Sequence, residues 1–480
     1  MEADGAGGID HKVIRAACLG DLVAEDDFCR RRTADVSQTD KQDALGGSHS
    51  RVIARELRSD NAKILQSSLA HELEDGVIPG MSMVARLRLR LFPRAEMAIR
   101  RGHPWIYGDS IKNQNREGEL GDLAVIYDRN DRFMALGLYD PGSPIRVRIV
   151  HLGKAATVDR AWWRERMMQC RQKRMESLWC EATTGLRMIN GESEGFPGLV
   201  VDRYAETLVV KIYTAAWLPR WEEMEALIRE VLGGRFLVLR MSRNIQQQAK
   251  KDWGLEEGFR GQVGEDVVVF RENGICFEAA VRDGQKTGFF LDQRENRSRL
   301  EALAANRDVL NVFSFSGAFS VYAARGGAKS VTDLDISAHA LASAERNFRL
   351  NQDDPRIPKV PRHQVQADAF EWMDQDESRY DLIIVDPPSL AKRESEREGA
   401  LRAYERLNRR AIEKLRPGGV LVSASCSAHV SADEFHAMLA KVAEQSRRPW
   451  KECWRSDHAQ DHPATYAEAH YLKAACLAFD

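Results

Sequence analysis

The chain has 480 residues, a length that corresponds to roughly two to four domains. Hydrophobic residues make up 43% of it and ten are tryptophans, which excludes a largely disordered protein. The net charge of −2 gives no whole-chain case for binding nucleic acid, so such binding would depend on local basic patches. None of the eight cysteines forms a C-x-x-C pair or a zinc-spaced cluster, so we expect reduced thiols and no metal.

Residues 1–84 differ in composition from the rest of the chain. Charge blocks such as RRRT alternate with glycine and serine, and Phe28 is the only aromatic residue before position 81. We expect a disordered extension, or one that reflects a misassigned start if translation begins at Met81 or Met83. The first residues do not resemble a signal peptide and no apolar run is long enough to span a bilayer, so a cytoplasmic protein is expected.

Residues 85–155 are predicted to form a small β-barrel. In ARLRLRLF, at 85–92, arginine alternates with leucine, which is the period of a half-buried strand with a basic face. Short β-forming runs with turn signals between them follow, up to SPIRVRIV at 143–150. Contact with nucleic acid is one interpretation of the basic face, and a merely solvated surface is the alternative.

Residues 156–267 are predicted to form a central α+β domain. The segment 158–178 has the spacing of a helix that places Trp163, Met167, Cys170 and Arg174 on one side. Two strands are expected in LVVDRYAETLVVKIY, and RWEEMEALIREVL indicates a second amphipathic helix.

From residue 268 to 480, β-forming runs alternate with helical segments, which is typical of a parallel, doubly wound α/β sheet. Ligands of such sheets bind at the carboxyl ends of the strands. Four residues with polar or reactive side chains stand at predicted strand ends, namely Asp335, Asp368, Asp386 and Cys426. We therefore expect the functional site to form around them.

The loop after the first of these strands, FSFSGAF, favours a nucleoside ligand without a pyrophosphate. Gly317 allows the backbone to approach a ligand closely, and Asp335 follows eighteen residues later, where an acid commonly holds ribose hydroxyls. The loop lacks the G-x-G-x-x-G spacing that cradles a pyrophosphate, which disfavours NAD. S-adenosylmethionine (SAM) fits this pattern better.

The segment VDPPS places Asp386 between an apolar strand and two prolines, which restrict where the carboxylate points. A plain strand-terminating turn is the alternative reading. D-P-P is typical of enzymes that methylate nucleobases. Those acting on exocyclic amines usually carry an aromatic residue next, and Ser389 at this position argues against N-methylation.

Cys426 ends the strand expected beside that of Asp386, so a thiol and a carboxyl group should face one pocket. A thiolate that adds to carbon 6 of a pyrimidine makes carbon 5 nucleophilic, and an acid at N3 of cytosine assists the addition. We expect Cys426 to be the nucleophile and Asp386 the acid. A buried strand residue is the alternative for Cys426. Glu468 is a candidate for the base that removes the C5 proton.

Several segments are similar to the ribosomal large subunit methyltransferase I family over about 85–480. They are GQKTGFFLDQRENR, LNVFSFSGAFSVYAARGGA, IIVDPPSLAK, LVSASCS and DHPATYAEAHYLK, with RRGHPWIYGDSI resembling the start of the family's PUA domain. The resemblance implies a SAM-dependent enzyme that makes 5-methylcytosine in 23S ribosomal RNA. It also implies an RNA-binding PUA-like domain, a Rossmann-like catalytic domain and a homodimer.

The resemblance further implies the residues of the site. Cys426 would be the nucleophile beside Asp386, Asp335 would hold the ribose and Asp368 the adenine side. A second glycine is frequent in the family where this chain has Ala318, whose Cβ would crowd SAM slightly. The remaining residues expected to contact SAM are Phe289, Gln293, Phe313, Ser314, Phe315 and Gly317.

Three alternatives stay open at this point. An RNA 5-methyluridine methyltransferase or a guanine N-methyltransferase could use the same fold. A non-catalytic RNA-binding protein with a decayed methyltransferase domain is the third, and the presence of Asp335, Asp386 and Cys426 argues against it.

Overall fold

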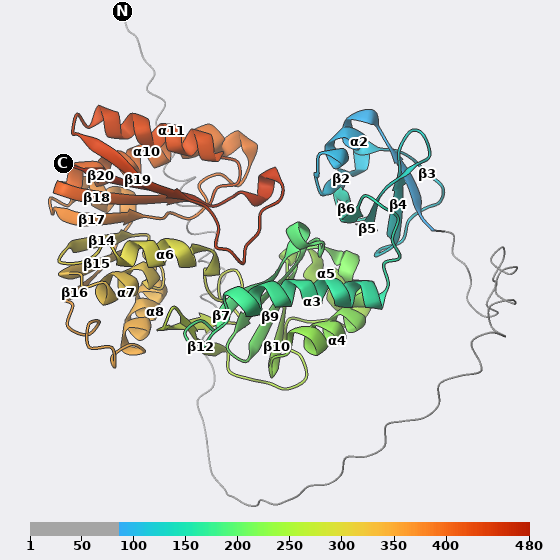
Figure 1. Cartoon of the computed structure of the whole chain (residues 1–480), viewed down its shortest axis with the longest axis horizontal. Helices are drawn as coiled ribbons and strands as arrows, with labels where there is room; N and C mark the ends of the chain where they lie inside the picture. Colours follow the sequence, from blue (N-terminus) through green and yellow to red (C-terminus); the bar gives the residue numbers. More distant parts are fainter. Residues whose placement is uncertain (1–85) are drawn as a thin grey trace, which may run out of the picture. The chain divides into compact units, whose positions relative to one another are not determined.

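The computed structural model describes residues 86–480, and the prediction for 1–84 lies outside them. Within this range the chain forms four β-sheets, with helices packed against the larger ones (Figure 1). None of the helices between residues 86 and 480 has the length and apolar character needed to span a bilayer. The exact domain boundaries stay predictions.

The first sheet has six strands between residues 88 and 152, in the order β2-β6-β5-β4-β1-β3. The alternation of arginine and leucine has the predicted result, because Leu89 and Leu91 are buried while Arg88 is exposed. The elements are β1 (Arg88–Leu91), α2 (Pro93–Arg100), β2 (Trp105–Tyr107), β3 (Ile111–Gln114), β4 (Leu123–Tyr127), β5 (Phe133–Tyr139) and β6 (Ile145–Leu152).

The second sheet has five strands between residues 185 and 259, in the order β11-β10-β9-β8-β7. Helix α3 (Arg160–Ser177) buries Trp163, Met167, Cys170 and Arg174, the four residues predicted to share one side. The other elements are β7 (Gly185–Asn190), β8 (Leu199–Tyr204), β9 (Thr207–Ile212), α4 (Trp221–Leu232), β10 (Phe236–Met241), α5 (Arg243–Trp253) and β11 (Gly258–Phe259).

A hairpin of β12 (Val267–Glu272) and β13 (Ile275–Ala280) precedes a seven-stranded sheet, which spans residues 308–479 in the order β16-β15-β14-β17-β18-β20-β19. The five strands predicted from the α/β pattern pair in parallel. They are β14 (Asp308–Val312), β15 (Ser330–Asp335), β16 (Arg362–Gln366), β17 (Tyr380–Val385) and β18 (Leu415–Ser425).

Helices cover both faces of this sheet (Figure 1). Successive strand residues point to opposite faces, so Val309 packs in the cluster that contains α7 while Leu310 packs in the cluster that contains α10 and α11. The helices are α6 (Arg294–Glu301), α7 (Ala318–Arg325), α8 (Ala338–Arg349), α9 (Ala369–Gln375), α10 (Arg397–Lys414) and α11 (Ala432–Gln445).

Two antiparallel strands at the C-terminus complete the sheet, and the sequence pattern did not indicate them. Strand β20 (Lys473–Phe479) lies between β18 and β19 (Trp450–Ser456) and pairs antiparallel with both. Strand β20 is buried almost throughout and therefore lacks the alternation of a half-exposed strand. Its pairing sets Lys473 opposite Ser425, at the end of β18.

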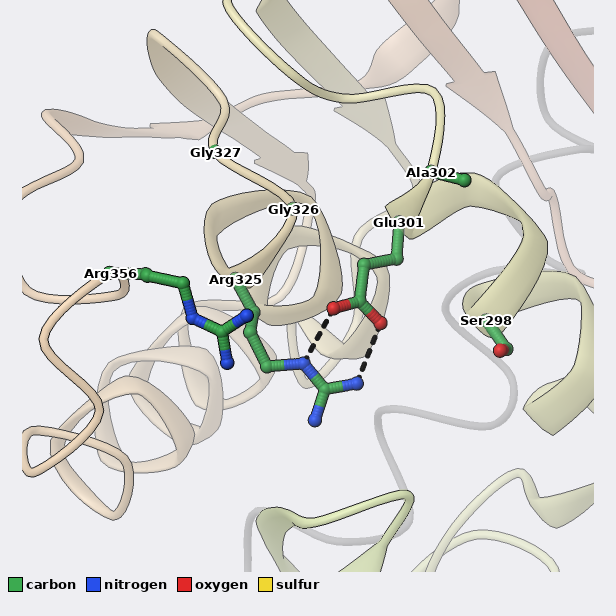
Figure 2. Close-up of a pocket in the computed structure, with 7 residues that line it drawn as sticks. All are labelled: Ser298, Glu301, Ala302, Arg325, Gly326, Gly327 and Arg356. Atoms are coloured by element: carbon green, nitrogen blue, oxygen red, sulfur yellow. Dashed lines mark hydrogen bonds and ion pairs between the residues drawn. The ribbon is translucent and has the colours of Figure 1, made fainter.

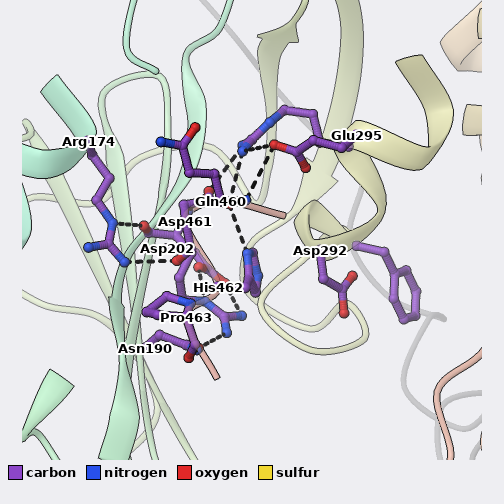
Figure 3. A network of polar contacts seen from close by, with 12 residues as sticks. Arg174, Asn190, Asp202, Asp292, Glu295, Gln460, Asp461, His462 and Pro463 are labelled. Atoms are coloured by element: carbon purple, nitrogen blue, oxygen red, sulfur yellow. Dashed lines mark hydrogen bonds and ion pairs between the residues drawn. The ribbon is translucent and has the colours of Figure 1, made fainter. Parts of the chain in front are cut away.

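The loop 457–472 between β19 and β20 returns to the second sheet through a buried polar network (Figure 3). The carboxylate of Asp461 accepts hydrogen bonds from the backbone of Arg187 at 2.8 Å and from the guanidinium of Arg294 at 3.0 Å. Arg174 donates to the carbonyl of Asp461 at 2.8 Å and forms an ion pair with Glu194. The network thus joins the C-terminal loop to α3 and β7.

Candidate active site

The predicted strand-end residues gather at the carboxyl edge of the seven-stranded sheet. Asp335 ends β15, Asp386 follows β17 and Cys426 follows β18, and β17 and β18 are paired neighbours. Asp368 lies beyond the end of β16 and caps α9 by accepting from the backbone N–H groups of Phe370 and Glu371.

The loop between β14 and α7 forms a cradle with an unusual backbone. Phe313, Phe315 and Gly317 all have positive φ angles, of 62°, 47° and 69°. A Cβ on Gly317 would lie 2.7 Å from the Cβ of Ala344, so only glycine fits there. The Asp335 carboxylate accepts from the backbone N–H of Phe315 at 2.8 Å and of Ser337 at 2.9 Å, which fixes the loop against β15.

This cradle fits the nucleoside of SAM. Burial raises the pKa of Asp335, and backbone N–H groups hold its carboxylate in place as an acceptor for ribose hydroxyls. The hydroxyl of Ser314 is buried with no hydrogen-bond partner among the described residues, so it offers a free polar group in the same loop. Phe315, Ser314 and Asp335 are the residues that would hold the group.

The two residues predicted from TGFFLDQR to line the SAM pocket lie in different surroundings. Phe289 is 3% exposed and packs against the rings of Phe270 and Phe277 in the core. The next ring, Phe290, contacts Phe315 of the cradle edge-on at 5.2 Å. Gln293 lies at the carboxyl group of Asp386, because its Nε2 donates to Oδ2 of that residue at 3.0 Å.

Asp386 is a carboxyl group that can act as an acid near neutral pH. Burial, followed by the negative charge of Asp292, raises its pKa to about 7. The pKa of Asp386 stays raised although three contacts lower it, namely those with Lys286 and Arg297 and the hydrogen bond from Gln293. A raised pKa of this size is typical of catalytic acids.

A chain of side-chain hydrogen bonds orients the amide of Gln293. Ser456 donates to Oδ1 of Asn296 at 2.5 Å, and Nδ2 of Asn296 donates to Oε1 of Gln293 at 2.6 Å. The amide NH₂ of Gln293 therefore faces Asp386 and occupies Oδ2 as a donor. A proton carried by Asp386 is thereby directed to Oδ1, which leaves that atom free to donate to a ligand.

Cys426 lies beside this carboxyl group. Its Sγ is 3.7 Å from the carbonyl oxygen of Pro387, the residue after Asp386, and its side chain is partly exposed. Burial, followed by the charge of Asp386, raises the pKa of Cys426 to about 12, while Lys286 and Lys473 oppose the rise. Protonation of Asp386 removes the negative charge that raises the pKa of Cys426 most and so favours the thiolate.

Ser427 joins the two strand-end loops, a role that the sequence analysis did not identify. Its buried hydroxyl accepts from the backbone N–H of Leu390 at 3.0 Å and of Ala391 at 3.3 Å, and it lies 3.0 Å from the hydroxyl of Tyr404. The loop after Asp386 is thus tied to the residue after Cys426. The second serine of SCS was the available sequence signal.

A charged cluster that includes residues of the segment before α6 completes the surroundings of Asp386 and Cys426. Lys286 forms an ion pair with Asp292, and the hydroxyl of Tyr471 donates to the same carboxylate oxygen at 2.7 Å. Burial alone would raise the pKa of Asp292, but Lys286 and His462 hold it below its ordinary value. Asp292 is therefore a carboxylate, whose charge acts on Asp386.

The structure places the candidate base Glu468 elsewhere. Its carboxylate lies 3.3 Å from Nε2 of His103, which precedes β2 of the first sheet, and its side chain is 44% exposed. Between residues 86 and 480, no hydrogen bond or ion pair joins it to Asp386 or Cys426. The geometry gives no support to Glu468 as the base.

A shallow pocket at the C-terminal end of α7 is separate from this edge (Figure 2). The cradle loop precedes the first residue of α7, whereas the pocket is lined by Gly326 and Gly327 beyond its last residue. Its two arginines are already paired, Arg325 with Glu301 and Arg356 with Asp354. This pocket is not a candidate for the site.

Comparison with protein families matches residues 221–447 to an S-adenosylmethionine-dependent methyltransferase model and residues 89–151 to a PUA-like domain model. The chain is 54% identical over 409 residues to a ribosomal RNA large subunit methyltransferase of Deinococcus radiodurans, covering 83% of this chain and 99% of that protein. It is 32% identical over 397 residues to ribosomal RNA large subunit methyltransferase I of Shewanella denitrificans, covering 81% and 98%.

Solved structures show the same fold. A SAM-dependent methyltransferase of Streptococcus mutans superposes with a TM-score of 0.68 at 22% identity, covering 82% of this chain and 99% of that one. A methyltransferase crystallised with S-adenosylhomocysteine superposes with a TM-score of 0.69 at 23% identity, with the same coverage.

Proposed function

The chain belongs to the SAM-dependent ribosomal RNA large subunit methyltransferases, and from this premise we propose that it methylates carbon 5 of a cytosine in 23S ribosomal RNA. The observation that carries the proposal is the placement of Asp386 and Cys426 just after the carboxyl ends of the neighbouring strands β17 and β18. Methylation at carbon 5 of cytosine requires a thiol as the nucleophile and a carboxylic acid as the proton donor.

In the proposed reaction Cys426, as a thiolate, adds to carbon 6 of cytosine and forms a carbon–sulfur bond. The displaced electron pair moves to N3, which takes the proton from Oδ1 of Asp386. Carbon 5 is then nucleophilic, and bound SAM supplies the electrophilic methyl group. A base then removes the C5 proton, and the electron pair of the broken C5–H bond forms the C5–C6 double bond and expels the Cys426 thiolate. N3 returns its proton to Asp386, which restores both the aromatic ring and the acid.

The protonation state of Asp386 supports cytosine rather than uracil as the target. N3 of cytosine is an acceptor, whereas N3 of uracil carries a proton. A pKa of about 7 keeps a large share of Asp386 in the acid form at neutral pH, and Gln293 directs that proton to Oδ1. The protonated carboxyl group of Asp386 can therefore donate a hydrogen bond to N3 of cytosine.

Binding of the RNA is proposed to begin at the PUA-like domain. Arg88 lies on the exposed face of β1, opposite the buried leucines of the strand, and such a face suits contacts to phosphate. The target base must leave its stack to reach Cys426 at the sheet edge. The RNA would therefore be bound by the PUA-like domain and methylated at the edge of the seven-stranded sheet.

The test uses methyl-labelled SAM and 23S ribosomal RNA that lacks the modification. Wild type is compared with Cys426→Ala, and Cys453→Ala serves as a control that removes an exposed thiol on β19. We expect label in 5-methylcytidine with wild type and the control and none with Cys426→Ala. Label in 5-methyluridine or a methylguanosine would overturn the base assignment. Unchanged activity of Cys426→Ala would overturn the covalent mechanism.

A further inference from the structure

Lys473 is a buried ammonium group that the proposed reaction has not yet used. It is the first residue of β20 and is 1% exposed. Its Nζ donates to three backbone carbonyls, those of Ser427 at 2.5 Å, Val430 at 2.5 Å and Tyr471 at 3.1 Å. These bonds use all three of its donors.

Such a group is expensive to bury without a counter-charge. Within residues 86–480, no carboxylate lies at ion-pair distance from this ammonium. Burial lowers the pKa of Lys473 to about 8, and the two ionisable groups that raise it are Cys426 and Glu434. Glu434 is already bound to Ser431 and Arg397, which leaves Cys426 as the candidate partner.

The placement of Lys473 is set by the sheet. Its pairing with Ser425 across β18 and β20 sets it opposite the residue before Cys426. Two of its three hydrogen bonds hold Ser427 and Val430, in the loop that follows Cys426. The ammonium therefore anchors the segment 426–430 and brings a positive charge to it.

We propose that Lys473 is a positioning residue that holds the loop of Cys426 and serves as the counter-charge of its thiolate. The inference rests on the proposed role of Cys426 as the nucleophile. Lys473 neither gains nor loses a proton in the reaction at a pH below its pKa of about 8, and the thiol proton leaves to water through the exposed part of the site. The same charge stabilises the thiolate again when it is expelled at the end of the reaction.

Other ionisable groups around Cys426 also influence the pKa of its thiol. Asp386 and Asp292 oppose the thiolate, and Lys286 favours it together with Lys473. Tyr404 of α10 and Tyr471 also face it, and both are neutral because burial raises their pKa. A change at Lys473 should therefore weaken the thiolate without abolishing it.

The test follows alkylation of Cys426 by iodoacetamide between about pH 6 and pH 10, read on its own peptide by mass spectrometry. Lys473→Met removes charge and donors, Lys473→Gln keeps donors without charge, and Lys473→Arg keeps both. Lys414→Met is the matched control. Lys414 is a buried lysine that donates to Asp376, and it lies just before β18, at the opposite end of the strand from Cys426.

We expect Lys473→Met and Lys473→Gln to alkylate about tenfold more slowly near neutral pH, equivalent to about one unit of thiol pKa. Lys473→Arg and Lys414→Met should keep the wild-type profile. A wild-type profile in Lys473→Gln overturns the proposal. If Lys473→Met does not fold, the comparison of Gln with Arg decides, and equal profiles overturn it.

The readout needs neither RNA nor SAM, so it separates this inference from the proposed function. If the Lys473 variants alkylate as expected but no 5-methylcytidine forms, the proposed function is wrong and Lys473 is still the counter-charge of Cys426. If 5-methylcytidine forms but the alkylation rate of Cys426 does not change in the Lys473 variants, the proposed function stands and the role of Lys473 is wrong.

Discussion

Burial raises the pKa of both Asp386 and Cys426, and the charge of ionised Asp386 raises that of Cys426 further. The proposed reaction needs the opposite arrangement, with Asp386 protonated and the thiol of Cys426 ionised. Each of these states favours the other, because a neutral Asp386 no longer repels a thiolate. The two groups therefore act as one coupled pair.

This coupling predicts an unusual pH dependence of kcat/KM. Below the pKa of about 7 of Asp386 the acid is protonated, so the rate should rise about tenfold per pH unit with the thiolate of Cys426, whose pKa is about 12. Above about pH 7 each tenfold gain in thiolate is offset by a tenfold loss of the acid, and the profile should level. Initial rates on target RNA across this range measure it.

Asp386→Asn is the variant that checks the cause. Asparagine keeps the size of the side chain but cannot transfer a proton, so we expect kcat to fall about 10²- to 10⁴-fold. The levelling above pH 7 should disappear, and the residual rate should keep rising with pH. Asp381→Asn, at the other end of β17, is the control for folding. A plateau that persists in Asp386→Asn would exclude Asp386 as its source.

At the scale of elements, the site depends on loops that short polar contacts lock to strand ends. Ser427 ties the loop after β17 to the loop after β18, and the Phe313–Gly317 loop is tied to β15 by Asp335. Strand pairing alone would bring the elements together without fixing these loops.

Ser427→Ala should weaken the link between the loop after β17 and the loop after β18. It leaves the backbone N–H groups of Leu390 and Ala391 without their acceptor, which costs about 1–3 kcal/mol of unfolding free energy. We expect kcat to fall while the Kd for SAM stays near the wild-type value. Urea unfolding measures the loss of stability, methylation rates measure kcat and calorimetry measures the Kd. Ser423→Ala, a buried serine further back on β18, serves as the matched control.

Gly317→Ala should impair SAM binding. The added Cβ would lie 2.7 Å from the Cβ of Ala344, and the residue has a φ of 69° that only glycine adopts freely. We expect at least about a tenfold higher Kd for SAM, measured by calorimetry. Gly327→Ala is the control, because its φ is 84° but the nearest atom is 3.9 Å away. Equal binding by Gly317→Ala and wild type would show that the cradle does not hold SAM.

At the scale of the whole molecule, buried ion pairs connect segments that are far apart in the sequence. Asp461, labelled in Figure 3, lies near the C-terminus. It accepts hydrogen bonds from the backbone of Arg187 and from the guanidinium of Arg294. Burial by itself would raise the pKa of Asp461, but His462 and Arg294 hold it well below its ordinary value, so the group stays ionised.

Asp461→Asn should destabilise the protein strongly. It leaves the buried guanidinium of Arg294 without its full counter-charge, and breaking such a pair costs about 3–5 kcal/mol. The lowered pKa means that the stabilisation is present at neutral pH and is lost as the pH falls through the folded-state pKa. Thermal unfolding of the variant beside Asp457→Asn, which alters an exposed aspartate of the same loop, measures the effect. Equal stability of the two would contradict the role of the network.

The sequence by itself determined the parallel α/β sheet and the identity of the strand-end residues Asp335, Asp386 and Cys426. Apolar periodicity and the local stiffness of VDPPS are encoded within a few residues, so they can be read without the fold. The resemblance carried the cofactor and the RNA substrate class.

Only the tertiary structure decided which side chains surround those residues. Gln293 reaches Asp386 across 93 positions and Lys473 reaches Ser427 across 46, and neither pairing leaves a local pattern. Glu468 was a candidate for the base, and the structure places it 3.3 Å from His103. The physical reason is the same in each case. Hydrogen bonds and charges act over a few ångströms, and distances of that kind exist only after distant segments have packed together.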